Sequence, residues 1–514
     1  MLLPRWLVAS AWAAFALAAL LPLLWLGLDA LSGEGRLSAL RDPLLTEAQW
    51  RLLARSLVVA GGAALLALGL GVPYALAIER TTMPGRHAFQ LLGLVPLLIP
   101  PQLHAIVWSR LLASSPVDPF SIPGVVLVLG LAYFPFVVLL TSAGLRAIDP
   151  TMEDGARLRV GPPRGLVGVT LALVRPHMLA AALLVFVFAI VDFGVPDLLR
   201  VRVYAVEVFI EFSALYDQRG AVFLSAPLLL TTMALVGIMT WLMRGRAYVS
   251  LSHGAGDAGR FRWGGPRIPA VLFCGSVLGL SVLVPVASLA VSAGAALFDP
   301  GVLRPALSAI GTSVSLAVSA GALTTMVAFV IARGLMQTSE VFRGALHALT
   351  QLPFALPPIL LGIGLIGLWN REATGWFYDG LGVVLVGYLA RFLPFAIGAM
   401  LASLQQLNPR LEEAAWLVTA NRLRILGGLS LPLLRDGLAA AFIIVFILTM
   451  GELGVTLLVV PPGVETLPVR IYNLMHYGAD ASVAALSLIL IAIQLLVCSL
   501  VLVGVRRRRP SVAS

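Results

Sequence analysis

Long apolar runs, separated by short polar segments, are the main pattern along this chain. A transmembrane helix needs roughly 20 mostly apolar residues, and runs of this kind predict about twelve spans. The first six are expected near residues 7–31, 52–78, 89–113, 122–145, 177–199 and 221–243. The last six are expected near residues 268–293, 305–332, 347–370, 381–403, 436–460 and 484–505. The first run is longer than the apolar core of a signal peptide, so we expect an uncleaved span.

The positions of the arginines predict the orientation. If the N-terminus lies inside the cell, 23 of the 35 arginines fall on inside segments, 11 on outside segments, and Arg391 falls within a span. Cytoplasmic loops carry such an excess of basic residues, so both termini are expected in the cytoplasm. Basic runs such as Arg506–Arg509 are then topology signals and contacts with anionic lipid, and no nucleic-acid partner is expected.

The composition supports a membrane protein and excludes several kinds of site. Of 514 residues, 59% are hydrophobic and 12% are charged, whereas soluble domains are about a quarter charged. Lysine is absent, which excludes a P-loop and a Schiff base in this chain. Cys274 and Cys498 lie in apolar runs and are expected to be buried. The six histidines show no metal-ligand spacing, so we expect no metal site and no cofactor.

The two halves of the sequence match each other at a nearly constant spacing. The spacing is 257 residues at a pair of prolines and drifts slowly to 260 residues at an acidic position. The matched positions include Pro100–Pro101 with Pro357–Pro358, Glu153 with Glu412, and Asp192 with Glu452. This slow drift is typical of an internal duplication. Because each half holds an even number of spans, the copies are expected to run parallel, with the transport pathway between them.

The duplication predicts the domain organisation of an all-α membrane protein. We expect a first six-span unit over residues 1–243 and a second over residues 268–505. A Gly-, Ser- and Arg-rich cytoplasmic linker is expected over residues 244–267, and a basic tail over residues 506–514.

Each half carries its longest polar interruption between its fourth and fifth spans, at about residues 146–176 and 404–435. Both loops start with a helix signal, since Asp149 or Asn408 precedes a proline and acidic residues follow in the first turn. We therefore expect a short amphipathic helix at the cytoplasmic face of each half.

The second loop resembles the E-A-A loop of ABC importer permeases. The resemblance rests on Glu413–Ala414–Ala415 and on the Leu431–Pro432 pair that ends the loop. In the first loop Asp154–Gly155–Ala156 stands in place of Glu-Ala-Ala, and Leu171–Ala172 stands in place of Leu-Pro. The glycine that follows the motif in the family is Thr419 here.

The resemblance implies that these loops are coupling helices that dock on ATP-binding subunits. The coupling residues it implies are Glu153, Asp154, Gly155, Ala156, Glu412, Glu413, Ala414 and Ala415. It further implies a permease with two fused permease units that is not itself an enzyme, in the bacterial inner membrane. The implied partners are two copies of an ABC ATP-binding subunit and a periplasmic or lipid-anchored solute-binding protein.

Three charged residues fall at membrane depth and are candidates for the solute path: Asp192, Glu452 and Arg391. Intramembrane charges are costly and mark pathways or structural pairs. The alternative is that each acid caps a helix near the outer end of its span. The segments Gly451–Thr456 and Thr466–Tyr472 resemble ferric-iron and thiamine permeases, which implies ferric iron as the solute, with thiamine or another small solute next.

Two other classes of protein fit the sequence less well. A secondary transporter of six plus six spans would need no ATPase, but the Glu79–His87 loop lacks the basic motif of the major-facilitator type. An intramembrane enzyme would need G-x-S-x-G, H-E-x-x-H or paired intramembrane aspartates, and the sequence has none of these.

Overall fold

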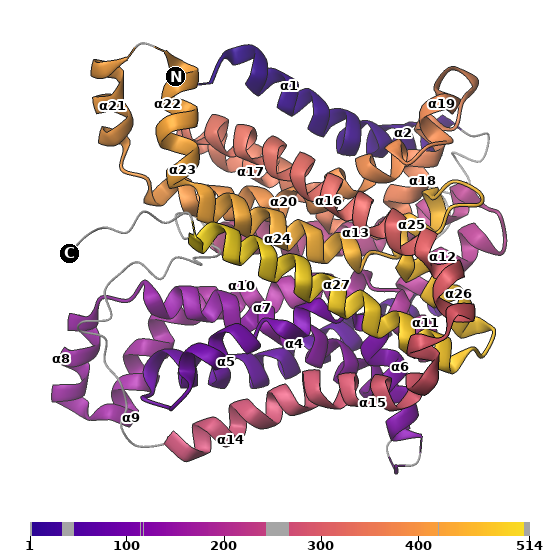
Figure 1. Ribbon diagram of the computed structural model, residues 1–514, viewed down its shortest axis with the longest axis horizontal. Coiled ribbons are helices and arrows are strands. Elements are labelled where there is room, and N and C mark those ends of the chain that lie inside the picture. Colours follow the sequence, from indigo (N-terminus) through magenta and orange to yellow (C-terminus); the bar gives the residue numbers. More distant parts are fainter. Residues whose placement is uncertain are drawn as a thin grey trace.

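The computed structural model describes residues 3–32, 46–113, 115–116, 118–242 and 267–507, and these form a helical bundle without a strand (Figure 1). Nine helices in this part are long and apolar enough to cross a membrane, or up to twelve when each of three bent pairs counts as one span. Each predicted run has a counterpart among them, so the all-α membrane fold is confirmed. The linker predicted at 244–267, apart from Arg267, and the tail from residue 508 lie outside the described residues, and the domain boundaries stay a prediction.

The first half contains the helices up to α13. They are α1 (Arg5–Phe15), η1 (Ala16–Leu20), α2 (Leu21–Ser32), α4 (Glu47–Arg80), α5 (Arg86–Leu92), η2 (Val95–Leu98), α6 (Pro101–Leu112), α7 (Ile122–Arg146), α8 (Pro150–Val160), α9 (Pro162–Gly165), η3 (Leu166–Thr170), α10 (Leu171–Val191), α11 (Gly194–Leu198), α12 (Tyr204–Ser213) and α13 (Gln218–Leu242).

The second half repeats this order. Its helices are α14 (Arg267–Leu278), η4 (Gly279–Leu283), α15 (Val284–Ala293), η5 (Gly294–Phe298), α16 (Pro300–Met336), α17 (Glu340–Ala355), α18 (Pro358–Trp369), η6 (Glu372–Thr374), α19 (Gly375–Tyr378), α20 (Gly382–Gln406), α21 (Pro409–Val418), α22 (Arg422–Ile425), η7 (Leu426–Ser430), α23 (Leu431–Leu433), α24 (Arg435–Met450), α25 (Gly454–Val459), α26 (Leu467–His476) and α27 (Asp480–Arg507).

Matching hydrogen bonds and π-helical turns support the internal duplication. The Ser56 hydroxyl on α4 accepts a hydrogen bond from the Tyr204 backbone N–H at 2.8 Å. Ser313 on α16 accepts the equivalent bond from the Leu467 N–H at 2.6 Å. A π-helical turn also recurs at η3 and η7, and again at η1 and η4. Such turns are rare in helices, so their recurrence at matched places follows from the repeated sequence.

The paired prolines break the third and ninth spans. The chain bends by 88° between Arg86–Leu98 and Pro101–Leu112, and by 95° between Phe342–Ala355 and Pro358–Trp369. Proline lacks the N–H that a helix needs and pushes the preceding residue out of helical conformation, so two consecutive prolines end one helix and start another. The sequence places the two proline pairs at matched positions of the two halves, and the structure shows a sharp break at each pair.

The helices predicted at 177–199 and 436–460 end about ten residues earlier than expected. α10 ends at Val191 and α24 at Met450, and a short helix follows each. The reason is the acid at each break: Asp192 accepts a hydrogen bond from the Val195 N–H, and Glu452 accepts one from the Val455 N–H, both at 2.9 Å. A carboxylate that binds the N–H three residues later caps a new helix.

The first span of each half packs against the opposite half (Figure 1). Phe15 and Ala18 share a hydrophobic cluster with α16 and α20, and Gly367 in α18 lies so close to Trp25 of α2 that a Cβ there would clash with the indole ring. In the other direction, Cys274 and Val277 of α14 are buried in the cluster of the first half. This exchange of spans ties the two units into one bundle.

Candidate functional site

The two predicted loop helices, α8 and α21, both form, and they lie at the same end of the bundle, at the left of Figure 1. Asp149 caps α8: its side chain accepts hydrogen bonds from the Thr151 N–H at 2.9 Å and the Thr151 hydroxyl at 2.8 Å. These bonds hold the pKa of the Asp149 carboxyl below its ordinary value. Asn408 caps α21 by accepting from the Arg410 N–H at 3.1 Å.

Glu153 of α8 points into the bundle and anchors the helix there. Its side chain is 3% exposed, and its carboxylate lies 3.0 Å from Nε of Arg80, at the end of α4. The Thr170 hydroxyl at the end of η3 donates to the same oxygen at 2.8 Å. Arg80 also donates to the Leu145 carbonyl of α7 at 2.6 Å. This acid clamp, made of Arg80, Glu153 and Thr170, joins α8 to three other elements.

The second half has an equivalent acid clamp made of Arg333, Glu412 and Ser430. Glu412 of α21 forms an ion pair with Arg333 in the last turns of α16. The Ser430 hydroxyl at the end of η7 donates to the Glu412 carboxylate at 2.7 Å. Glu412 and Ser430 match Glu153 and Thr170 at spacings of 259 and 260 residues, so the acid and the hydroxyl are repeated. Arg80 and Arg333 are 253 residues apart, about one helical turn away from the 257-residue spacing of Ser56 and Ser313 on the same helices.

Most of the remaining predicted coupling residues face away from the clamps. Successive residues of a helix point about 100° apart, so the first two residues after each anchoring glutamate reach the surface, whereas the third turns back toward the clamp side. Asp154, Gly155, Glu413 and Ala414 are exposed, while Ala156 and Ala415 are half-buried. Large apolar side chains accompany them, with Leu158 88%, Leu417 91% and Val418 87% exposed. Exposed apolar groups beside polar ones at an aqueous end are typical of a docking surface.

The eight predicted coupling residues therefore divide into two groups that the sequence does not separate. Glu153 and Glu412 hold the helices, and the others form or flank the exposed face. The sequence alone did not predict the clamp partners Arg80, Arg333, Thr170 and Ser430. The hydroxyl residues at matched positions in two copies were an available signal, but nothing local in the sequence joins them to the acids.

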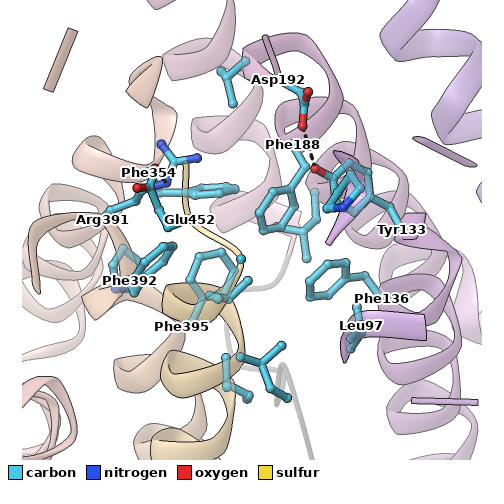
Figure 2. Close-up of a pocket in the computed structure, with 18 of the residues that line it drawn as sticks. Leu97, Tyr133, Phe136, Phe188, Asp192, Phe354, Arg391, Phe392, Phe395 and Glu452 are labelled. Carbon is cyan, nitrogen blue, oxygen red and sulfur yellow. Dashed lines mark hydrogen bonds and ion pairs between the residues drawn. The ribbon is translucent and has the colours of Figure 1, made fainter. Parts of the chain in front are cut away.

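A cavity of about 210 Å³ lies between the two halves. All three candidate solute-path residues, Asp192, Glu452 and Arg391, line it (Figure 2). Much of its wall comes from matched positions: Asp192 with Glu452, Tyr133 with Phe392, Phe136 with Phe395, and Gly194 with Gly454. The cavity lies between the copies, where the sequence predicts the pathway, and the pathway itself stays a prediction.

The charged residues of the cavity are held differently in the two halves. The Tyr133 hydroxyl donates to Asp192 at 3.2 Å. Glu452 accepts from the Val455 and Thr456 N–H groups at 2.9 and 3.0 Å and from the Thr456 hydroxyl at 2.6 Å. Arg391 Nε lies 4.0 Å from the nearest Glu452 oxygen. Each acid thus caps a helix and also lines the cavity. The helix cap is confirmed, and a role in the solute path stays a prediction.

An aromatic cluster centred on Phe188 fills the space beside these charges (Figure 2). Phe188 of α10 stacks on Tyr133 and Phe136 of its own half, with ring centroids 5.2 and 5.0 Å apart. It also contacts Phe354 and Phe395 of the other half at 4.9 and 5.6 Å. One side chain therefore joins the cavity walls of the two halves.

This chain is similar in sequence to known membrane transport proteins. Residues 324–510 match the family described as binding-protein-dependent transport system inner membrane component. The Fe(3+)-transport system permease protein FbpB 2 of Haemophilus influenzae is 26% identical over 432 residues, which make up 82% of this chain and 82% of that relative. The chain is an ABC importer inner-membrane permease.

Two further relatives of this permease differ in how much of the chain they cover. The ferric transport system permease protein FbpB of Actinobacillus pleuropneumoniae is 22% identical over 87% of this permease and 70% of its own length. The molybdenum transport system permease protein ModB of Haemophilus influenzae is 29% identical over 37% of this permease and 89% of its own length. The ModB match corresponds in size to one permease unit.

Metal binding and cysteine chemistry were the other candidates to look for in the part of the permease that the structure describes. No group of three or more His, Cys, Asp or Glu residues there is arranged to hold a metal ion. Cys274 and Cys498 are buried and unpaired with each other, as expected.

Replacing Glu153 by Gln should lower the thermal stability of the permease, because the buried Arg80 loses its charge partner. Removing one member of a buried ion pair costs about 3 kcal/mol, so the melting temperature in detergent should fall measurably. Asp154→Asn, one residue away on the exposed face, should leave it unchanged. The double variant Arg80→Met/Glu153→Gln should recover part of the loss, and equal melting temperatures for Glu153→Gln and wild type would refute the clamp.

Proposed function

We propose that this permease imports ferric iron across the bacterial inner membrane, driven by two copies of an ATP-binding subunit. Two relatives that cover most of the chain are named for Fe(3+) or ferric transport. The cavity offers the carboxylates of Asp192 and Glu452, and oxygen ligands suit a hard cation. Thiamine or another small solute is the next candidate.

The observation that carries the ATP-driven mechanism is the pair of clamped helices. α8 and α21 lie at one end of the bundle, and each presents exposed apolar side chains while its glutamate is held inside. One ATP-binding subunit docks on each helix, so the stoichiometry is two per chain. Both chain termini lie on this cytoplasmic side, and a solute-binding protein delivers solute at the opposite end.

The clamps give a physical route for coupling. When the ATP-binding subunits close, they move α8 and α21, and the clamps pass the motion to α4 and α16 and to the helices that begin at η3 and η7. α10 and α24 lead from there to Asp192 and Glu452 at the cavity. The cavity then opens alternately to the two sides of the membrane.

Introducing a charge on the exposed face of each coupling helix should abolish binding of the ATP-binding subunit. We expect the subunit to co-purify at about two copies per wild-type chain in mild detergent, and to be lost from Leu158→Arg/Leu417→Arg because burying an arginine where an apolar side chain docks is costly. Tyr477→Arg, equally exposed but at the other end of the bundle, is the matched control. Iron uptake by the purified chain alone, driven by a proton or sodium gradient, would refute the ATP-driven mechanism and favour a secondary transporter.

Neutralising the cavity acids should reduce iron transport without loss of assembly. In proteoliposomes with the ATP-binding subunit and the binding protein, Asp192→Asn/Glu452→Gln should take up radioactive iron about tenfold more slowly. The single amide oxygen of each variant still accepts one capping backbone N–H, Val195 N–H or Val455 N–H, so the short helices remain. Unchanged iron uptake, or transport of thiamine in place of iron, would contradict the proposed solute.

A further inference from the structure

Arg391 is the charged residue of the cavity that has no counterpart in the other half. The matched position, at a spacing of 259 residues, is Ala132, and both residues line the cavity. Arg391 comes from α20 and its side chain is 13% exposed. Figure 2 shows it beside Glu452, across the aromatic cluster from Asp192 and Tyr133.

The guanidinium of Arg391 is only loosely held by the protein. Its Nε lies 4.0 Å from the nearest Glu452 oxygen, which is beyond hydrogen-bond distance. Its central carbon lies 5.9 Å from the centroid of the Phe392 ring. Among the described residues none accepts a hydrogen bond from it, although a guanidinium carries five N–H donors.

The two acids nearby already have hydrogen-bond donors of their own. Glu452 accepts from two backbone N–H groups and from the Thr456 hydroxyl. Asp192 accepts from the Val195 N–H and the Tyr133 hydroxyl. Their positions are therefore fixed by their own helix caps and by Tyr133, whereas Arg391 lines the cavity with no hydrogen-bond acceptor among the described residues.

A charged donor group at membrane depth is costly unless a bound polar group accepts its hydrogen bonds. The planar fork of a guanidinium matches two oxygens of a carboxylate or a phosphate. We propose that Arg391 is a subsite for an oxyanion group carried by the transported solute. Resting on the proposed function, this means that iron crosses as a complex that bears a carboxylate or phosphate group, because such a group gives the guanidinium its acceptor while the metal faces the carboxylates.

The asymmetry of the cavity fits such a complex. Arg391 stands on the wall of the second half, and Asp192 with Tyr133 on the wall of the first half (Figure 2). An anionic ligand and the metal that it binds would thus meet opposite charges on opposite walls. Glu452 competes with the oxyanion group of the solute for Arg391. This competition keeps the binding of the solute weak enough for release, as transport requires.

The test is direct binding of oxyanions to the full-length permease in lipid nanodiscs, without any ATP-binding subunit. The probes are radioactive citrate and radioactive inorganic phosphate, measured by equilibrium dialysis against excess chloride. The variants are Arg391→Gln, Arg391→Lys and, as a matched control, Arg110→Gln, which removes an arginine that pairs with Asp480 outside the cavity. Thermal unfolding of each variant verifies its fold.

We expect saturable binding to wild type and to Arg110→Gln, at least tenfold weaker binding to Arg391→Gln, and intermediate binding to Arg391→Lys, which keeps the charge but loses the fork. Binding of citrate alone assigns the site to carboxylates, and binding of phosphate alone to phosphates. No saturable binding of either probe to folded wild type, or equal binding by Arg391→Gln, overturns the proposal. If Arg391→Gln unfolds, equal binding by Arg391→Lys and wild type overturns it. Because no ATP-binding subunit is present, these outcomes are independent of whether the permease is ATP-driven.

Discussion

The buried ion pair between Arg80 and Glu153, and its counterpart between Arg333 and Glu412, is the interaction on which the rest of the account depends. Charges that are buried or partly buried are stable only when they are paired and hydrogen-bonded, and each of these carboxylates has an arginine and a hydroxyl. The pairing fixes which face of each loop helix is inside. It therefore determines which residues remain on the exposed face that we propose as a docking site, and it attaches that face to the long helices of the bundle.

The two clamps are alike, but the paths that lead from them differ. In the first half, one helical span runs from Leu166 to Val191 and ends at Asp192. In the second half, the chain bends by 63° between Leu426–Leu433 and Arg435–Met450 before it reaches Glu452. The cavity walls differ as well, because Arg391 of the second half matches Ala132 of the first in sequence, and Phe392 matches Tyr133. A fused chain lets the two copies diverge in this way, which a symmetric pair of identical subunits could not do.

Sequence reasoning predicted the elements of this fold well, because a span is a local property of about 20 residues. It also predicted that the acids at 192 and 452 occupy equivalent places. It could not show that Glu153 is inside while Asp154 is outside, since that depends on Arg80 and Thr170, which are distant in the chain. The sequence also could not predict that the first span of each half packs against the other half, because Trp25 contacts Gly367 only in the folded bundle. Arg391 was found by its charge, but its lack of an acceptor is a property of the cavity.

The central claim is that the clamps transmit motion from the coupling helices to the far end of the bundle. Distances between pairs of spin labels test it. In the assembled transporter, with Cys274 and Cys498 replaced by alanine, one pair of labels sits at Leu158→Cys and Leu417→Cys. A second pair sits at the exposed tyrosines of the opposite end, Tyr216→Cys and Tyr477→Cys. The account predicts that ATP shortens the first distance and lengthens the second, and that Glu153→Gln/Glu412→Gln keeps the first change but loses the second. An undiminished second change in that variant would contradict it.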